Sequence, residues 1–79
     1  MPLITQLGNK VRRLRELAGL SQAELAEAIG LSQYSKGFIS EIESGKKIPR
    51  SELVLRLSLY FKVTTDYLLR DDMVANGDS

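Results

Sequence analysis

The chain has 79 residues and a formal net charge of +1, and 43% of its residues are hydrophobic, so it can form one small domain with its own core. It contains no cysteine and no histidine, which excludes a disulfide framework and the usual nucleophile–base pairs of enzymes. The longest apolar runs, such as Leu53-Val54-Leu55, are three residues long, too short for a membrane span or a signal peptide. We therefore expect a cytoplasmic protein that is not an enzyme and has no metal, cofactor or small-molecule ligand.

The charge is distributed unevenly along the chain. Residues 1–20 carry a net charge of +3, residues 21–45 one of −3, residues 46–50 one of +3 and residues 71–79 one of −3. Such blocks bear on the binding partner more than the total charge does. Because residues 71–79 contain little apolar surface, we expect them to form a disordered acidic tail after a folded domain that spans residues 1–70.

The first two helices have clear sequence signals at their ends. Apolar residues recur every three or four positions over residues 4–18, the spacing of an amphipathic helix. Gly19 ends this helix, because glycine adopts the left-handed conformation after a C-cap without steric penalty. Ser21 begins the next helix, since Glu24 completes a capping box worth about 1 kcal/mol. Gly30 ends the second helix in the same way as the first.

The rest of the chain predicts three more short helices. Apolar spacing resumes at Phe38 and stops at Gly45, and Pro49 prevents a helix in the basic loop that follows. A fourth helix is expected over residues 51–61 and a last short one over residues 65–69. No segment shows the alternation of a strand. The predicted fold class is therefore all-α, a compact bundle of five helices.

Three motifs occur in a characteristic order. Leu-Ser-Gln-x-x-Leu-Ala begins at Leu20, Ile-Ser-x-Ile-Glu-x-Gly begins at Ile39, and Val63 precedes Asp-x-Leu-Leu. Together they resemble the lambda-repressor-like helix-turn-helix family of bacterial and phage regulators (the XRE type), which includes short phage repressors and restriction-modification controller proteins. The resemblance runs from about Leu7 to Leu69. It implies that helices 2 and 3 form the motif and that helix 3 lies in the major groove of double-stranded DNA.

The turn between helices 2 and 3 departs from the family pattern. Six residues lie between Ser32 and Ile39, where the family has three. We place the three extra residues in the turn and assign Ser35 as the N-cap of helix 3, which restores the family spacing. In the alternative, Ser32 is the cap, helix 3 gains a turn, and Gly37 falls inside the helix at a cost of about 1 kcal/mol relative to alanine.

The resemblance also implies a set of DNA contacts. Lys36 suits guanine and Glu41 suits a cytosine amino group, but a solvent-facing carboxylate at that position would repel phosphate. Tyr34 and Phe38 either touch a thymine methyl group or sugar or pack against the protein, and we favour packing for Phe38. The residues expected to contact bases are Lys36, Gly37, Ser40 and Glu41. Those expected to contact phosphates, rather than to be ordinary exposed residues, are Gln22, Lys46, Lys47 and Arg50.

Two residue pairs are assigned structural roles. Arg15 and Glu43 occupy positions at which the family often pairs helix 1 with helix 3, and such a buried ion pair orients the motif. Leu55 and Leu59 lie one above the other on helix 4 and form the expected dimer interface, unless residues 67–73 cover them. They fall opposite the helical-wheel positions that we assign to the core, namely Leu53, Val54, Leu57, Tyr60 and Phe61.

The sequence thus predicts a transcriptional regulator, a repressor or autoregulator, that binds specific DNA as a homodimer on a palindromic operator. A bacterial or phage-encoded protein in the cytoplasm fits this prediction. The alternative function is a helix-turn-helix module that binds another protein, such as an antitoxin-type partner. The basic clusters beside helix 3 favour DNA, whereas Glu41 and the acidic tail favour the alternative.

Overall fold

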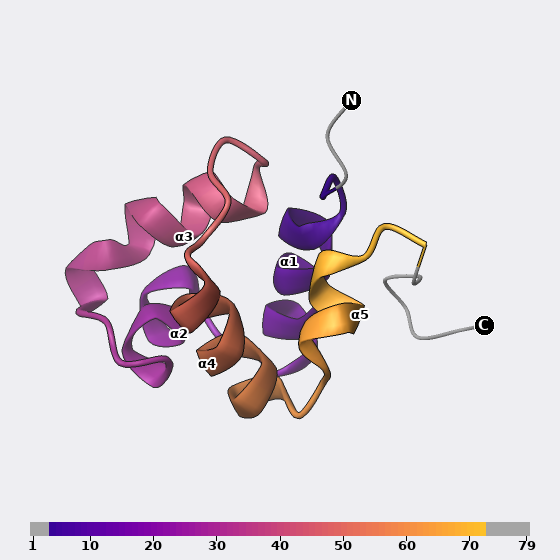
Figure 1. Cartoon of the computed structure of the whole chain (residues 1–79). Helices are drawn as coiled ribbons and strands as arrows, with labels where there is room; N and C mark the ends of the chain where they lie inside the picture. Colours follow the sequence, from indigo (N-terminus) through magenta and orange to yellow (C-terminus); the bar gives the residue numbers. More distant parts are fainter. Residues whose placement is uncertain (1–3, 73–79) are drawn as a thin grey trace.

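The computed structural model describes residues 4–72, in which all the regular structure is helical. The elements are α1 (Leu7–Leu17), α2 (Gln22–Ala28), the short 3-10 helix η1 (Gln33–Ser35), α3 (Lys36–Glu43), α4 (Ser51–Phe61) and α5 (Thr65–Leu69). The predicted all-α fold of five helices is confirmed. In Figure 1, α2 and α3 lie on one side of the molecule and α5 on the other, with α1 and α4 between them.

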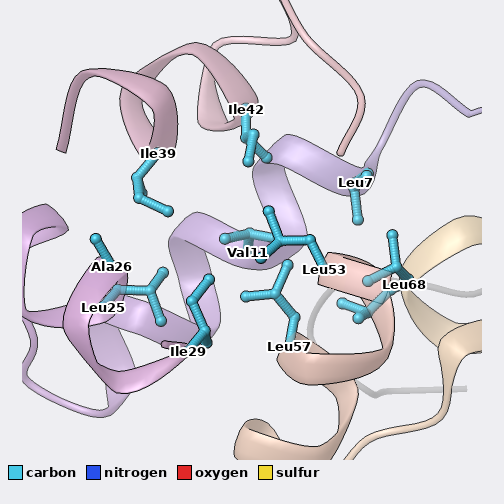
Figure 2. Packing of buried hydrophobic residues seen from close by; sticks show 11 residues of the cluster. Leu7, Val11, Leu25, Ala26, Ile29, Ile39, Ile42, Leu53, Leu57 and Leu68 are labelled. Carbon is cyan, nitrogen blue, oxygen red and sulfur yellow. The ribbon is translucent and has the colours of Figure 1, made fainter. Parts of the chain in front are cut away.

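One hydrophobic core receives side chains from all five α-helices, and Figure 2 shows these side chains converging between them. The buried residues of this core are Leu7, Val11, Leu25, Ala26, Ile29, Ile39, Ile42, Leu53, Val54, Leu57 and Leu68. The assignment of Tyr60 to the core was wrong, because its side chain is 42% exposed. Tyr60 lies at the edge of the apolar arc of α4, where its ring meets that of Phe61 edge-on with the ring centres 5.1 Å apart.

The connection between α1 and α2 has the predicted end signals. Gly19 has a φ of 72°, and the N–H of Leu20 donates to the carbonyl of Arg15 across the end of α1, as in a Schellman motif. Ser21 and Glu24 form the capping box: the Glu24 N–H donates to Ser21 Oγ at 3.0 Å, and the Ser21 N–H donates to Glu24 Oε1 at 2.8 Å. Four residues, 18–21, therefore suffice to end α1 and to begin α2.

The turn between α2 and α3 differs from the prediction. α3 begins at Lys36, but the side chain of Ser35 makes no capping hydrogen bond. Instead, Ser32 Oγ accepts a hydrogen bond from the Tyr34 N–H at 3.1 Å and caps η1. The reason lies in the backbone: an N-cap needs an extended conformation, which Ser32 has (ψ 154°) and Ser35 does not (ψ 14°). The three extra residues thus form an additional helical turn.

α1 begins at Leu7 and not at Ile4, where the apolar spacing starts. The N–H groups of Thr5 and Gln6 both donate to Asp71 Oδ1, at 2.7 and 3.0 Å. The Thr5 hydroxyl donates to Asp71 Oδ2 at 2.7 Å, and this bond, together with the two backbone bonds, holds the pKa of the Asp71 carboxyl below its usual value. Asp71 is the first residue of the segment that we expected to be disordered. Residues 73–79 lie outside the described part of the chain, so the expectation for them stays a prediction.

Lys10 is a buried cation that the sequence analysis had counted among the charged residues of the N-terminal block. Its side chain is fully buried, and its ammonium group donates to the backbone carbonyls of Tyr67 and Arg70. Burial lowers its pKa. Its position offered a signal, because Lys10 falls between Leu7 and Leu14 on the apolar face of α1. Lys10 and Asp71 together hold the end of α5 against α1.

The backbones of α1 and α3 come into contact at Gly8. A Cβ atom at this position would lie 2.4 Å from the carbonyl oxygen of Ile42 and 2.7 Å from that of Glu43. Neither oxygen belongs to a flexible side chain, so the helices would have to move apart to admit even a methyl group. Gly8 therefore sets the distance between α1 and the C-terminal end of α3.

We predict that Gly8→Ala lowers the free energy of unfolding by about 2–3 kcal/mol, because the added methyl group overpacks a backbone contact. Gly37→Ala is the matched control, since a Cβ there would meet nothing within 4 Å. This control should be as stable as the unsubstituted protein or more stable by up to about 1 kcal/mol, from helix propensity. Urea denaturation of the three proteins measures the difference. Equal stabilities for the two variants would contradict the close contact at Gly8.

Candidate nucleic-acid interface

A buried ion pair joins α1 to the C-terminal end of α3. Glu43 is 4% exposed. Arg15 Nε donates to Glu43 Oε2 at 2.6 Å and Arg15 Nη2 donates to Glu43 Oε1 at 3.1 Å, while Nη1 donates to the carbonyl of Leu20 at 2.8 Å. The hydrogen bonds with Glu43 raise the pKa of the Arg15 guanidinium. The structure thus brings together the two residues that the sequence analysis paired.

Two further residues surround the same carboxylate. Gln22 Nε2 donates to Glu43 Oε1 at 3.2 Å, and Arg12 Nε lies 3.8 Å from this oxygen. Gln22 uses one of its two amide N–H groups here and keeps its amide oxygen and the other N–H for a further partner. Glu43 therefore links α3 to both α1 and the first residue of α2. The sequence predicts only a phosphate contact for Gln22 and does not indicate Arg12, which lies one helical turn before Arg15.

The predicted base-contact residues share the outer face of α3. Lys36, Gly37 and Ser40 are exposed, and Glu41 is half-buried. Ile39 and Ile42 lie on the opposite face, in the core. The surface that results is narrow and carries small or flexible side chains, so another molecule can approach the backbone of α3 closely.

Glu41 does not stand as an isolated negative charge on this face. Its Oε1 lies 3.2 Å from Lys47 Nζ. The same ammonium group lies 5.7 Å from the centre of the Phe38 ring, within the range of a cation–π contact. Phe38 itself is half-buried and packs against the core. The structure therefore joins two residues, Glu41 and Lys47, that the sequence analysis treated as separate DNA contacts.

The remaining cations of the basic loop are free to meet an anion. Lys46 and Arg50 are exposed, and within residues 4–72 neither side chain has a hydrogen-bond or ion-pair partner. The N–H groups of Lys46 and Lys47 both bond to the carbonyl of Glu41, which holds the start of the loop against the end of α3. Buried Pro49 anchors its other end beside α4. The loop that follows α3 thus carries two unpaired positive charges.

α4 has an exposed apolar face. Leu55 and Leu59 are 49% and 69% exposed. The alternative, that residues 67–73 cover them, does not hold for the part of that segment that the structure describes, because Tyr67, Arg70 and Asp71 contact α1 and the residues before it. Beside this face is a hollow of about 400 Å³. It is lined by Ala28, Ile29, Arg56, Leu59 and Tyr60.

Other kinds of site are not found in the described part of the chain. Residues 4–72 contain no group of three or more side chains that could hold a metal ion. None of the helices in this range has the length and apolar character needed to cross a membrane.

The fold and this surface define a helix-turn-helix domain, in which α2 and α3 form the motif and the outer face of α3 is open. A sequence model of the helix-turn-helix family matches residues 11–68. The chain belongs to this family, of the lambda-repressor-like (XRE) type.

The chain is similar to known regulators and to solved structures of this family. The chain is 33% identical over 69 residues to the HTH-type transcriptional regulator ImmR of Bacillus subtilis (strain 168), an alignment that covers 87% of this chain and 52% of that protein. It thus spans about half the length of this curated relative. The P22 c2 repressor in complex with a synthetic operator has a TM-score of 0.70 and 30% identity, covering 91% of this chain and 96% of the other. The solution structure of its DNA-binding domain has a TM-score of 0.69 and 31% identity, covering 86% of each chain.

We predict that Arg15→Ala lowers the free energy of unfolding by about 3 kcal/mol, because it leaves the buried Glu43 carboxylate without its main counter-charge. Arg12→Ala is the control: it removes an exposed cation near the same carboxylate and should change stability by less than about 1 kcal/mol. Chemical denaturation without DNA separates the two. An Arg15→Ala variant as stable as Arg12→Ala would show that Arg15 is dispensable at this junction.

Proposed function

We propose that this protein is a sequence-specific DNA-binding transcriptional regulator, a repressor or autoregulator that acts on a palindromic operator. The observation that carries the proposal is the open outer face of α3, which the Glu43 junction holds against α1 and α2 and which unpaired cations adjoin. The similarity to the transcriptional regulator ImmR and to the P22 c2 repressor bound to an operator supports it. We infer further that the protein acts in the cytoplasm without catalytic activity, cofactor or small-molecule ligand.

The proposal assigns roles to individual residues. Lys36 donates to guanine O6 or N7, and Gly37 and Ser40 let α3 lie close to the base edges. Glu41 and Lys47 exchange their surface ion pair, worth at most about 1 kcal/mol, for contacts with a cytosine amino group and a phosphate. The remaining phosphate contacts are made by Gln22, Lys46 and Arg50.

One observation in favour of the alternative function, a module that binds another protein, is weakened. The negative charge of Glu41 on α3 favours a protein partner, but Lys47 pairs with this carboxylate. DNA-binding measurements decide between the two functions.

We predict that binding to a selected DNA site weakens steeply with salt, because each protomer neutralises about three phosphates through Lys46, Lys47 and Arg50 and log K falls by about 0.9 per phosphate for each tenfold rise in salt. Lys46→Ala should reduce the slope by about one per protomer. Arg13→Ala is the control, since it removes one positive charge beside Tyr67 of α5 and away from α3, and should leave the slope unchanged. Fluorescence anisotropy across a salt series measures the slopes. No binding at low salt would instead favour the protein-interaction module.

We propose that two copies associate through the exposed face of α4. Leu55 and Leu59 remain 49% and 69% exposed and offer apolar surface, and the hollow beside Leu59 has room for a side chain of the second copy. Half-sites one DNA turn apart are separated by about 34 Å, so the contact would have to set the two copies of α3 at this distance. A two-fold contact of this kind would give each protomer its own major groove.

We predict that the double variant Leu55→Glu, Leu59→Glu is a monomer at tens of micromolar, because two carboxylates would be buried in the interface. Leu17→Glu, at a leucine of α1 that is 73% exposed, is the control and should still dimerise. Sedimentation velocity gives the masses. A monomeric unsubstituted protein that binds only single half-sites would refute the dimer.

A further inference from the structure

The extra residues of the turn lengthen the recognition helix at its N-terminal end. η1 ends at Ser35 and α3 begins at Lys36, so the two helices follow each other directly, with Ser35 (φ −90°, ψ 14°) at the junction. A 3-10 helix rises about 2 Å per residue, and the three residues of η1 therefore add about 6 Å. Because successive base pairs are spaced by about 3.4 Å, the extension spans nearly two base-pair steps.

The extension continues the outer face of α3. Ser35 and Phe38, three residues apart, are both half-buried and mark the inner side of the segment. Tyr34 and Gly37, also three residues apart, are both exposed. With 3.0 to 3.6 residues per turn, Tyr34 therefore lies one turn before Gly37, on the side of the helix that carries the proposed base contacts.

Nothing within the described part of the protein uses the side chain of Tyr34. It is 87% exposed, the highest value among the exposed large hydrophobic side chains of residues 4–72. Within the same range its ring and hydroxyl have no hydrogen-bond, ring or ion-pair partner. The space over Gly37, the next position on this face, is open as well, since a Cβ there would meet nothing within 4 Å. Packing against the protein therefore does not account for Tyr34.

We propose that Tyr34 determines part of the DNA sequence preference by placing its ring against the C5-methyl group of a thymine, at a base step adjoining the one that Lys36 contacts. This inference rests on the proposed function. The thymine methyl is the apolar feature of the major groove, and aromatic side chains contact it. The added turn of η1 carries the ring to base pairs that α3 alone would not reach.

The first experiment selects bound sites from a random DNA pool with the unsubstituted protein and with Tyr34→Ala, Tyr34→Phe and Lys36→Ala. We expect Tyr34→Ala to lose a thymine preference at one position of each half-site and to keep the rest of the motif. Tyr34→Phe should keep that preference, because the contact needs the ring and not the hydroxyl. Lys36→Ala, the control, should change a neighbouring position instead.

The second experiment replaces the thymine at that position with deoxyuridine, which removes only the methyl group. The affinity of the unsubstituted protein should fall about fourfold, the effect of one methyl group withdrawn from an apolar contact. The affinity of Tyr34→Ala should not change. Because the side chain is exposed, Tyr34→Ala should also have an unchanged melting temperature, so that a loss of folding cannot imitate the effect.

The outcomes distinguish this proposal from the one on which it rests. If Tyr34→Ala selects the same motif as the unsubstituted protein, or if deoxyuridine leaves binding unchanged, η1 is only a spacer, and the proposal for Tyr34 is overturned while the DNA-binding function stands. Loss of the preference in Tyr34→Phe as well would assign the contact to the hydroxyl and overturn the ring–methyl contact. An unsubstituted protein that selects no motif would overturn both proposals.

Discussion

The carboxylate of Glu43 has to be neutralised where it lies, because an uncompensated charge in a protein interior costs several kcal/mol. Arg15 on α1 and Gln22 on α2 donate hydrogen bonds to this carboxylate. The carboxylate accepts both sets of bonds only when α3 lies in one orientation. Hydrophobic contacts tolerate small rotations of a helix, but a bidentate guanidinium–carboxylate pair does so much less. The polar contacts of Glu43 on the inner face of α3 therefore fix the direction in which the outer face points.

Gly8 acts on the same helix pair in a complementary way. The junction at Glu43 sets the rotation of α3 about its axis, whereas the backbone contact at Gly8 sets its distance from α1. Arg56 plays a similar part on the far side of the motif, where its guanidinium donates to the carbonyl of Ile29 at the end of α2 and to Glu52 of its own helix. The motif is thus tied to the supporting helices by a few directional contacts around a common core.

Features that depend on neighbouring residues could be predicted from the sequence, and those that depend on distant ones could not. Gly19 and the Ser21–Glu24 pair act within a few residues, and both are found as expected. α3 begins directly after Ser35 as predicted, but the expected side-chain cap is missing, because the conformation of η1 decides it and the hydroxyl pattern does not reveal that conformation. Asp71 accepts hydrogen bonds from Thr5 and Gln6, which precede it in the chain by 66 and 65 positions. No local sequence pattern indicates such a contact. The Arg15–Glu43 contact is also distant, and only the family resemblance pointed to it.

These sequence separations also imply an order of assembly. Thr5 and Asp71 are 66 positions apart, whereas Arg15 and Glu43 are 28 apart. Closing the longer loop costs about 0.8 kcal/mol more in chain entropy, and its hydrogen bonds are exposed, whereas the Glu43 junction is partly buried. The two ends of the domain should therefore join last during folding and separate first in native fluctuations. The helix-turn-helix would then stay folded while the two ends of the chain separate. Amide protons near Thr5 would exchange with solvent well before those of α3.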